Sequence, residues 1–182
     1  MAMNQPIETP DNPFWNFSLQ FYGQKGVSDL LLWFQDEWHA DINLILYCCW
    51  AGVFQKNGLT EVDINFLRRA VDRWQSEIVQ PLRSLRQTLT TDARGAPAAL
   101  VAGLLASLKQ AELKAERLQQ DMLYSSVPRE THGSPDEGGA RQHASSNMVL
   151  YLTQVRGPLN TVGMAKITAL VDALFDPDFR NH

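Results

Sequence analysis

Two long runs of apolar residues with helical spacing constrain the fold of this chain most. From Ile64 to Leu89, and again from Val101 to Met122, apolar residues recur every three or four positions. The members of the second run are Val101, Leu104, Leu108, Ala111, Ala115, Leu118 and Met122. The stretch "TTDARGAP" between the runs is rich in turn-forming residues. We therefore predict a long antiparallel helical hairpin, kinked near Pro81, because a proline inside a helix removes a backbone hydrogen bond.

Helix-start signals divide the chain before the hairpin into three further helices. Pro13 suits the first position of a helix, Ser28 is placed to cap a second helix, and Asp41 is placed to cap a third. Thr60 and Asp63 have the spacing of a capping box at the start of the hairpin. No stretch alternates as a strand would. The sequence thus predicts an all-α helical bundle, in which an aromatic N-terminal three-helix layer packs on the hairpin.

The composition changes after the hairpin. Residues 126–147 contain two prolines and three glycines and almost no large apolar residue. We predict a flexible linker there, between a single helical domain at residues 1–125 and a C-terminal helical segment at residues 148–182. The pattern leaves open whether that segment docks on the bundle or stays mobile.

Composition and charge exclude several classes of protein. The chain has 182 residues, of which 45% are hydrophobic and 20% charged, as in soluble globular proteins. Its net charge of −4 argues against a nucleic-acid partner, which would need a basic surface. The longest apolar stretch, residues 44–54, is far shorter than the about 20 residues that span a membrane. With no signal peptide in view, we expect a cytoplasmic protein without a membrane partner.

Four motifs in order resemble a known family. They are "NPFWNFSLQFYGQKGV", "LLWFQDEWHADINLILYCCWAG", "RWQSEIVQPLRSLR" and "KQAELKAERLQ". Over residues 12–123 the chain is similar to an uncharacterised family of small proteobacterial hypothetical proteins, a domain of unknown function. The resemblance implies a small bacterial helical protein and brings no catalytic residues. A fainter resemblance, to the all-α squalene and phytoene synthases, implies paired acidic motifs that hold magnesium and diphosphate.

Five residues have the types and spacing of metal ligands. Asp36, His39 and Asp41 lie within six positions, and Glu112 and Glu116 are four apart on one predicted helix. However, Asp41 has a capping role, and no second histidine completes a familiar ligand set. Counting outward from a turn at Arg94 places both glutamates beside Arg69, Asp72 and Arg73, so cross-helix ion pairs are the favoured interpretation. The metal site is kept as an alternative.

Arginines and one tryptophan are the candidates for contact with a partner. Arg83, Arg86 and Arg94 cluster towards the hairpin turn, where they either receive an acidic partner or form a solvated surface. All five tryptophans lie in the first 74 positions, which favours an aromatic core. Trp33 lies off the main apolar stripe of its helix and is a candidate partner-facing anchor.

The function expected from these features is binding rather than catalysis. No nucleophile motif, phosphate loop or dinucleotide fingerprint is present, and Cys48 and Cys49 lie among apolar neighbours that make a thiol inert. We expect no catalytic residues and no cofactor, and a non-enzymatic adaptor or regulatory protein that binds another protein. The alternative is a small metal- or ligand-binding enzyme with the acidic site described above.

Overall fold

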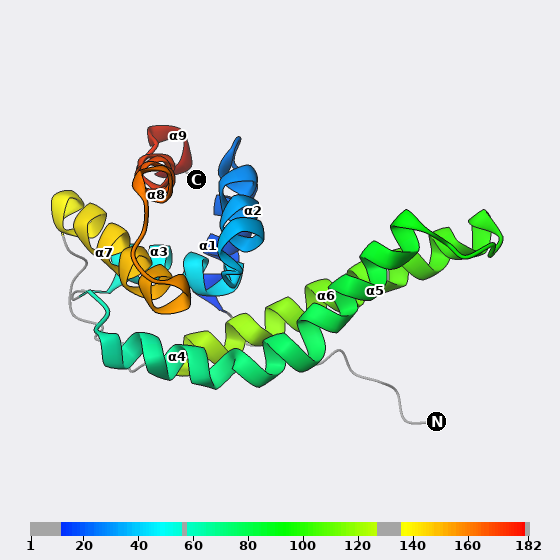
Figure 1. Ribbon diagram of the computed structural model, residues 1–182. Helices are drawn as coiled ribbons and strands as arrows, with labels where there is room; N and C mark the ends of the chain where they lie inside the picture. The colour runs from blue at the N-terminus through cyan, green and yellow to red at the C-terminus, as the bar shows by residue number, and fades with distance from the viewer. Residues whose placement is uncertain (1–11, 56–57, 127–135, 181–182) are drawn as a thin grey trace, which may run out of the picture.

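The structure, a computed structural model, describes residues 12–55, 58–126 and 136–180. Every regular element in these ranges is a helix, which confirms the all-α prediction. The elements are α1 (Pro13–Tyr22), α2 (Val27–Trp38), α3 (Ile42–Phe54), α4 (Glu61–Trp74), the π-helical η1 (Gln75–Val79), α5 (Gln80–Thr91), α6 (Ala98–Ser126), α7 (Glu137–Arg156), α8 (Thr161–Leu174) and α9 (Pro177–Arg180). Helices α1–α3 and α7–α9 form a body, and α4–α6 form a hairpin along one side of it (Figure 1).

Local capping signals account for most helix starts. The Asn12 side chain accepts a hydrogen bond from the Trp15 amide ahead of Pro13, and Asp41 accepts one from the Asn43 amide. Thr60 and Asp63 form the predicted capping box. The second helix is present as predicted, but the cap predicted at Ser28 was wrong, because α2 starts at Val27 without a side-chain cap. The chain enters it through Gly26, whose φ of 84° suits glycine.

Helix α3 is the centre of the core. It is buried almost all round, and its longest interface is with α7. A Cβ placed on Gly52 would lie 2.4 Å from the Ala144 backbone nitrogen, so the two helices approach as closely as glycine permits. Phe14 packs on Tyr47 and Trp50 with ring centroids 5.2 and 5.7 Å apart, which confirms that these aromatic residues are core.

The predicted linker is partly helical. Helix α7 begins at Glu137, after Asp136 has capped the Gly139 amide, so residues 137–147 are not a linker. The composition misled the prediction because Ala140 and Ala144 are small residues that allow α7 to lie against α3. The remainder of the predicted linker, residues 127–135, lies outside the described residues. The C-terminal helices dock: α7 and α8 join the same hydrophobic cluster as α1–α3.

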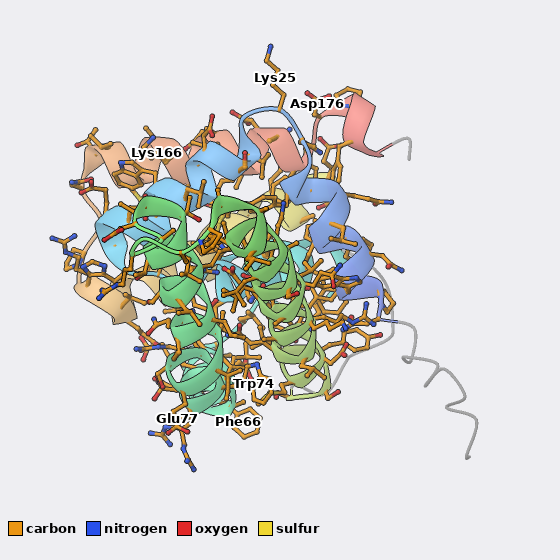
Figure 2. All side chains as sticks on the ribbon, turned by 90° about the vertical axis from the view of Figure 1, so that its right-hand side faces the viewer. Lys25, Phe66, Trp74, Glu77, Lys166 and Asp176 are labelled. Carbon is orange, nitrogen blue, oxygen red and sulfur yellow. The ribbon has the colours of Figure 1, made fainter. Side chains whose placement is uncertain are left out.

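The hairpin has the predicted antiparallel arrangement and an interruption before Pro81. The interruption takes the form of the π-helical turn η1, after which α5 continues to the turn and α6 returns beside it. Trp74 donates a hydrogen bond from Nε1 to the Ala115 carbonyl oxygen at 2.9 Å, which joins α4 to α6. Figure 2 looks at the molecule from the side of the hairpin turn, with Phe66, Trp74 and Glu77 on the hairpin and Lys166 at the opposite edge.

The apolar seam predicted for α6 is correct only in part. Val101, Leu108 and Ala115 are buried, but Leu104 and Leu118 are about half exposed. The buried face instead includes polar residues, namely Glu112, Gln119 and Gln120. A pattern of apolar residues cannot detect a helix face that is buried by hydrogen bonding. None of the helices in the described part of the chain is long and apolar enough to cross a membrane.

Candidate functional site

A cleft lies between the body and the hairpin. Its volume is about 570 Å³, and its walls come from α1, α2, the start of α3, α5 and α6. The apolar part of the lining consists of Trp15, Leu19, Tyr22, Leu32, Ile42, Leu46 and Leu113. A smaller cavity of about 240 Å³ is adjacent to the cleft. The two share the lining residues Gln35, Asp41 and Arg83. Apolar walls around a few polar groups are typical of binding sites.

An ion-pair cluster joins α5 to α6 at the edge of the cleft. Arg83 donates from Nε to Glu112 at 2.9 Å and from Nη2 to Glu116 at 2.7 Å, and Arg86 donates from Nε to Glu112 at 2.5 Å. Arg83 also donates from Nη1 to the Gln35 side chain on α2. The cluster therefore ties the hairpin to itself and to the body.

Burial and ion pairing set the titration of the cluster. Burial by itself raises the pKa of Glu112, but the hydrogen bonds from Arg86 and Arg83 outweigh it and hold that pKa below its usual value. For Glu116, burial dominates over the attraction of Arg83, and the pKa is raised. The two carboxylates thus differ in environment although they share Arg83.

A relay of side-chain hydrogen bonds runs from the cap of α3 into the cleft. Gln119 donates from Nε2 to the Asp41 carboxylate, Asn43 donates from Nδ2 to Gln119 at 2.7 Å, and Gln120 donates from Nε2 to Asn43 at 2.8 Å. Burial raises the pKa of Asp41 to about 6, against the hydrogen bonds from the Asn43 amide and Gln119. The Asp41 carboxylate accepts hydrogen bonds from the Asn43 amide at 2.9 Å and from Gln119.

The relay ends in an unsatisfied acceptor. The Gln120 Oε1 atom is buried and has no hydrogen-bond partner in the structure, and the same holds for Ser18 Oγ on α1. Both side chains line the cleft, and each is only 3% exposed. A buried polar atom without a partner costs free energy, on the order of 1–3 kcal/mol, which ordinary packing would avoid.

Five of the nine predicted site residues meet at this cleft. Arg83 and Arg86, predicted as partner contacts, and Asp41, Glu112 and Glu116, predicted as alternative metal ligands, all line it. The ion pairs predicted for the glutamates are present, but with different arginines, since Arg83 and Arg86 replace the predicted Arg69 and Arg73. The count from Arg94 matched the backbone, since Trp74 on one helix bonds to Ala115 on the other. It ignored that the long arginine and glutamate side chains each lean towards the N-terminus of their own helix, which brings them together across several positions.

The other four predicted residues lie elsewhere. Asp36 is exposed on α2, and His39, in the left-handed conformation at the end of that helix, lines the smaller cavity. Trp33 is partly buried, with the Lys166 ammonium 4.9 Å from the centre of its ring. Arg94 is exposed in the hairpin turn. Across residues 12–55, 58–126 and 136–180, no three His, Cys, Asp or Glu side chains are grouped to hold a metal ion.

The end of the hairpin forms a second candidate surface. We call residues 84–110 the hairpin arm; its turn extends beyond the body (Figure 1). Within the arm only Val101 and Leu108 are buried, while Leu85, Leu100 and Leu104 are 48%, 73% and 49% exposed. Leu100 and Leu104, four residues apart, lie on one face of α6.

Sequence reasoning missed Ser18, Asn43, Gln119 and Gln120. Ser18, Gln119 and Gln120 look like ordinary polar residues in amphipathic helices, and Asn43 looks like a polar residue in the first turn of α3. The one available signal was the pair Gln119 and Gln120 beside the apolar Leu118, Met122 and Leu123, a polar interruption where α6 should face the core.

Comparison with known proteins gives one match. A family model described as a protein of unknown function (DUF2390) matches residues 13–123, which confirms the predicted resemblance to a domain of unknown function. No curated protein and no solved structure matches the chain.

Proposed function

We propose that this chain, which belongs to the DUF2390 family of proteins of unknown function, is a cytoplasmic, non-enzymatic bacterial protein that binds another protein through its hairpin arm. The observation that supports this proposal is the exposed leucine face of the arm. Leu100 and Leu104 have no cover from the body, and α5 contributes no buried residue at all. Exposed apolar residues at helical spacing are the usual anchors of helix-to-helix recognition.

Charge indicates the kind of partner. Arg94 and Lys109 are the exposed cations of the arm, and Asp92 is its only carboxylate. The Asp92 side chain accepts a hydrogen bond from the Arg94 amide at 2.8 Å and so belongs to the turn. The arm is thus slightly basic in a chain of net charge −4. We infer that the partner presents an amphipathic helix with acidic residues, which such an arm would attract and orient.

The four residues predicted to contact a partner differ in how well their positions support that role. Arg83 and Arg86 direct guanidinium nitrogens at Glu112 and Glu116, which favours a role in positioning the arm over direct contact. One face of the Trp33 ring is covered by Lys166. Of the predicted partner-binding residues, Arg94 is the one whose position best supports contact.

Photo-crosslinking in the native cells tests the proposal. A photoreactive amino acid at Leu104 should capture one partner, while the same amino acid at Val162, which is equally exposed on α8, should not. With the captured partner purified, the double variant Leu100→Ser, Leu104→Ser should weaken binding at least about tenfold. Val162→Ser combined with Met164→Ser is the matched control. Equal binding by both double variants would refute the assignment to the arm.

The alternative of a metal-dependent enzyme has its own test. It is less favoured because Glu112 and Glu116 pair with arginines. A rise in melting temperature with Mg²⁺ that disappears in Glu112→Gln would support the enzyme instead.

A further inference from the structure

The cleft contains two polar groups that folding leaves without partners. The Ser18 Oγ and Gln120 Oε1 atoms are both buried, and both residues belong to the lining of the cavity. They come from different helices, α1 and α6, and the cleft is large enough for a small organic molecule. Neither group is needed for the proposed contact of the arm with a protein partner.

The hydrogen-bond relay determines which chemistry Gln120 offers. Gln119 donates to the Asp41 carboxylate, so it directs its NH₂ group at Asp41 and its carbonyl at Asn43. Asn43 must then direct its carbonyl at the NH₂ group of Gln120. Each amide is oriented by the one before it, so Gln120 presents a carbonyl oxygen, which calls for a donor on the ligand.

The charges around the cleft determine which donor is favoured. The charged side chains that line it are three carboxylates, two guanidiniums and one exposed ammonium at the rim, namely Asp41, Glu112, Glu116, Arg83, Arg86 and Lys109. Without the solvated Lys109, the inner groups carry one excess negative charge. An anion is disfavoured in that setting, whereas a cation balances the excess.

We propose that the cleft binds a small amphipathic amine, whose apolar body lies against Trp15, Tyr22 and Leu113 and whose ammonium group donates a hydrogen bond to Gln120 Oε1. The Ser18 hydroxyl supplies a second polar contact to the same ligand. The indole, the phenol ring and the leucine side chain form the apolar wall beside these polar groups. The unpaired atoms are then the cost in stability of a site prepared for its ligand.

Three probes with one apolar body and different head groups test the proposal on the full chain. We would measure binding of phenylbutylamine, phenylbutanol and phenylbutyrate by titration calorimetry at neutral pH. The amine should bind most tightly and the carboxylate most weakly, and the side-chain amide resonances of Gln120 should shift on binding the amine. Equal affinity for amine and carboxylate, or a cleft that takes up only water, would overturn the proposal.

Two variants and a control keep the test specific. Gln120→Leu should weaken binding of phenylbutylamine about 10- to 100-fold, the effect of losing a hydrogen bond to a charged group. Gln110→Leu, on the exposed face of the same helix, should leave it unchanged. Because Gln120→Leu also breaks the bond to Asn43, Ser18→Ala is the second variant. It should weaken binding and raise the melting temperature of the free protein, since it removes an unpaired buried hydroxyl. Unchanged amine binding in both variants would refute the site.

Discussion

Replacing Gly52 by alanine should separate the two helices at the centre of the core. The new Cβ would lie 2.4 Å from the Ala144 nitrogen, 2.5 Å from its Cα and 2.7 Å from its Cβ. Ordinary contacts of this kind begin near 3.4 Å, so α3 and α7 would have to move apart by about 1 Å. A gap of that size forfeits about a quarter to a half of each dispersion contact across the interface.

The size of the effect follows from the rigidity of the two backbones. Overpacking costs about 1–3 kcal/mol, and here the upper end applies because backbone, rather than a flexible side chain, must yield. The hydrogen bond from Asn147 Nδ2 to the Cys48 carbonyl, 3.1 Å long, spans the same interface and would lengthen. Alanine recovers about 0.5–1 kcal/mol of helix propensity. We therefore expect a net loss of about 2 kcal/mol, or a fall in melting temperature of roughly 4–8 °C.

Urea unfolding followed by circular dichroism measures this loss. Gly103→Ala is the matched control, because a Cβ there meets nothing within 4 Å, and it should stabilise by about 0.5–1 kcal/mol. Adding Ala144→Gly to Gly52→Ala should rescue only part of the loss, since the contacts to backbone nitrogen and Cα remain. Full rescue, or a Gly52→Ala protein as stable as wild type, would show that the close approach of backbones is not what makes Gly52 necessary.

Three further variants probe the site. Glu112→Gln should cost about 1–3 kcal/mol in urea unfolding, because the arginines lose a charged partner. Since the pKa of Glu112 is lowered on folding, its contribution is present above the usual carboxyl pKa and should be lost as pH falls below it. For Asp41 the pH dependence of stability has the opposite sign, because burial raises its pKa to about 6 in the folded protein. Wild type should gain stability relative to Asp41→Asn as pH falls from 7 to 4. A constant difference between the two proteins would contradict this. Trp74→Phe should cost about 1 kcal/mol for the lost hydrogen bond to Ala115. An unchanged stability would show that this bond does not hold α4 and α6 together.

The success of the sequence predictions depended on how local the signal was. The cap at Asp41, the capping box of Thr60 and Asp63 and the interruption before Pro81 were all correct or nearly so. Each depends on groups within a few positions along the chain, because a cap satisfies amides in the next turn and a proline acts on its own helix.

Errors arose where a distant segment decided the outcome. Residues 137–147 look like a linker because small and polar residues dominate them, yet Ala144 is buried against Gly52. Leu104 was expected in the seam of α6 but is half exposed. Whether a small residue or a leucine is buried depends on which segment packs against it, and that segment is distant in the sequence.

By itself the sequence determined the helical class, the hairpin, most helix starts and the absence of familiar catalytic motifs, because periodicity, caps and prolines act within a turn or two of helix. Only the tertiary structure decided which arginines meet Glu112 and Glu116, how Asp41, Gln119, Asn43 and Gln120 form one relay, and that the relay opens into a cleft. The residues of the relay are up to 79 positions apart, the separation of Asp41 from Gln120 (120 − 41). Their partners are therefore chosen by how α3 and α6 pack, which no local pattern encodes.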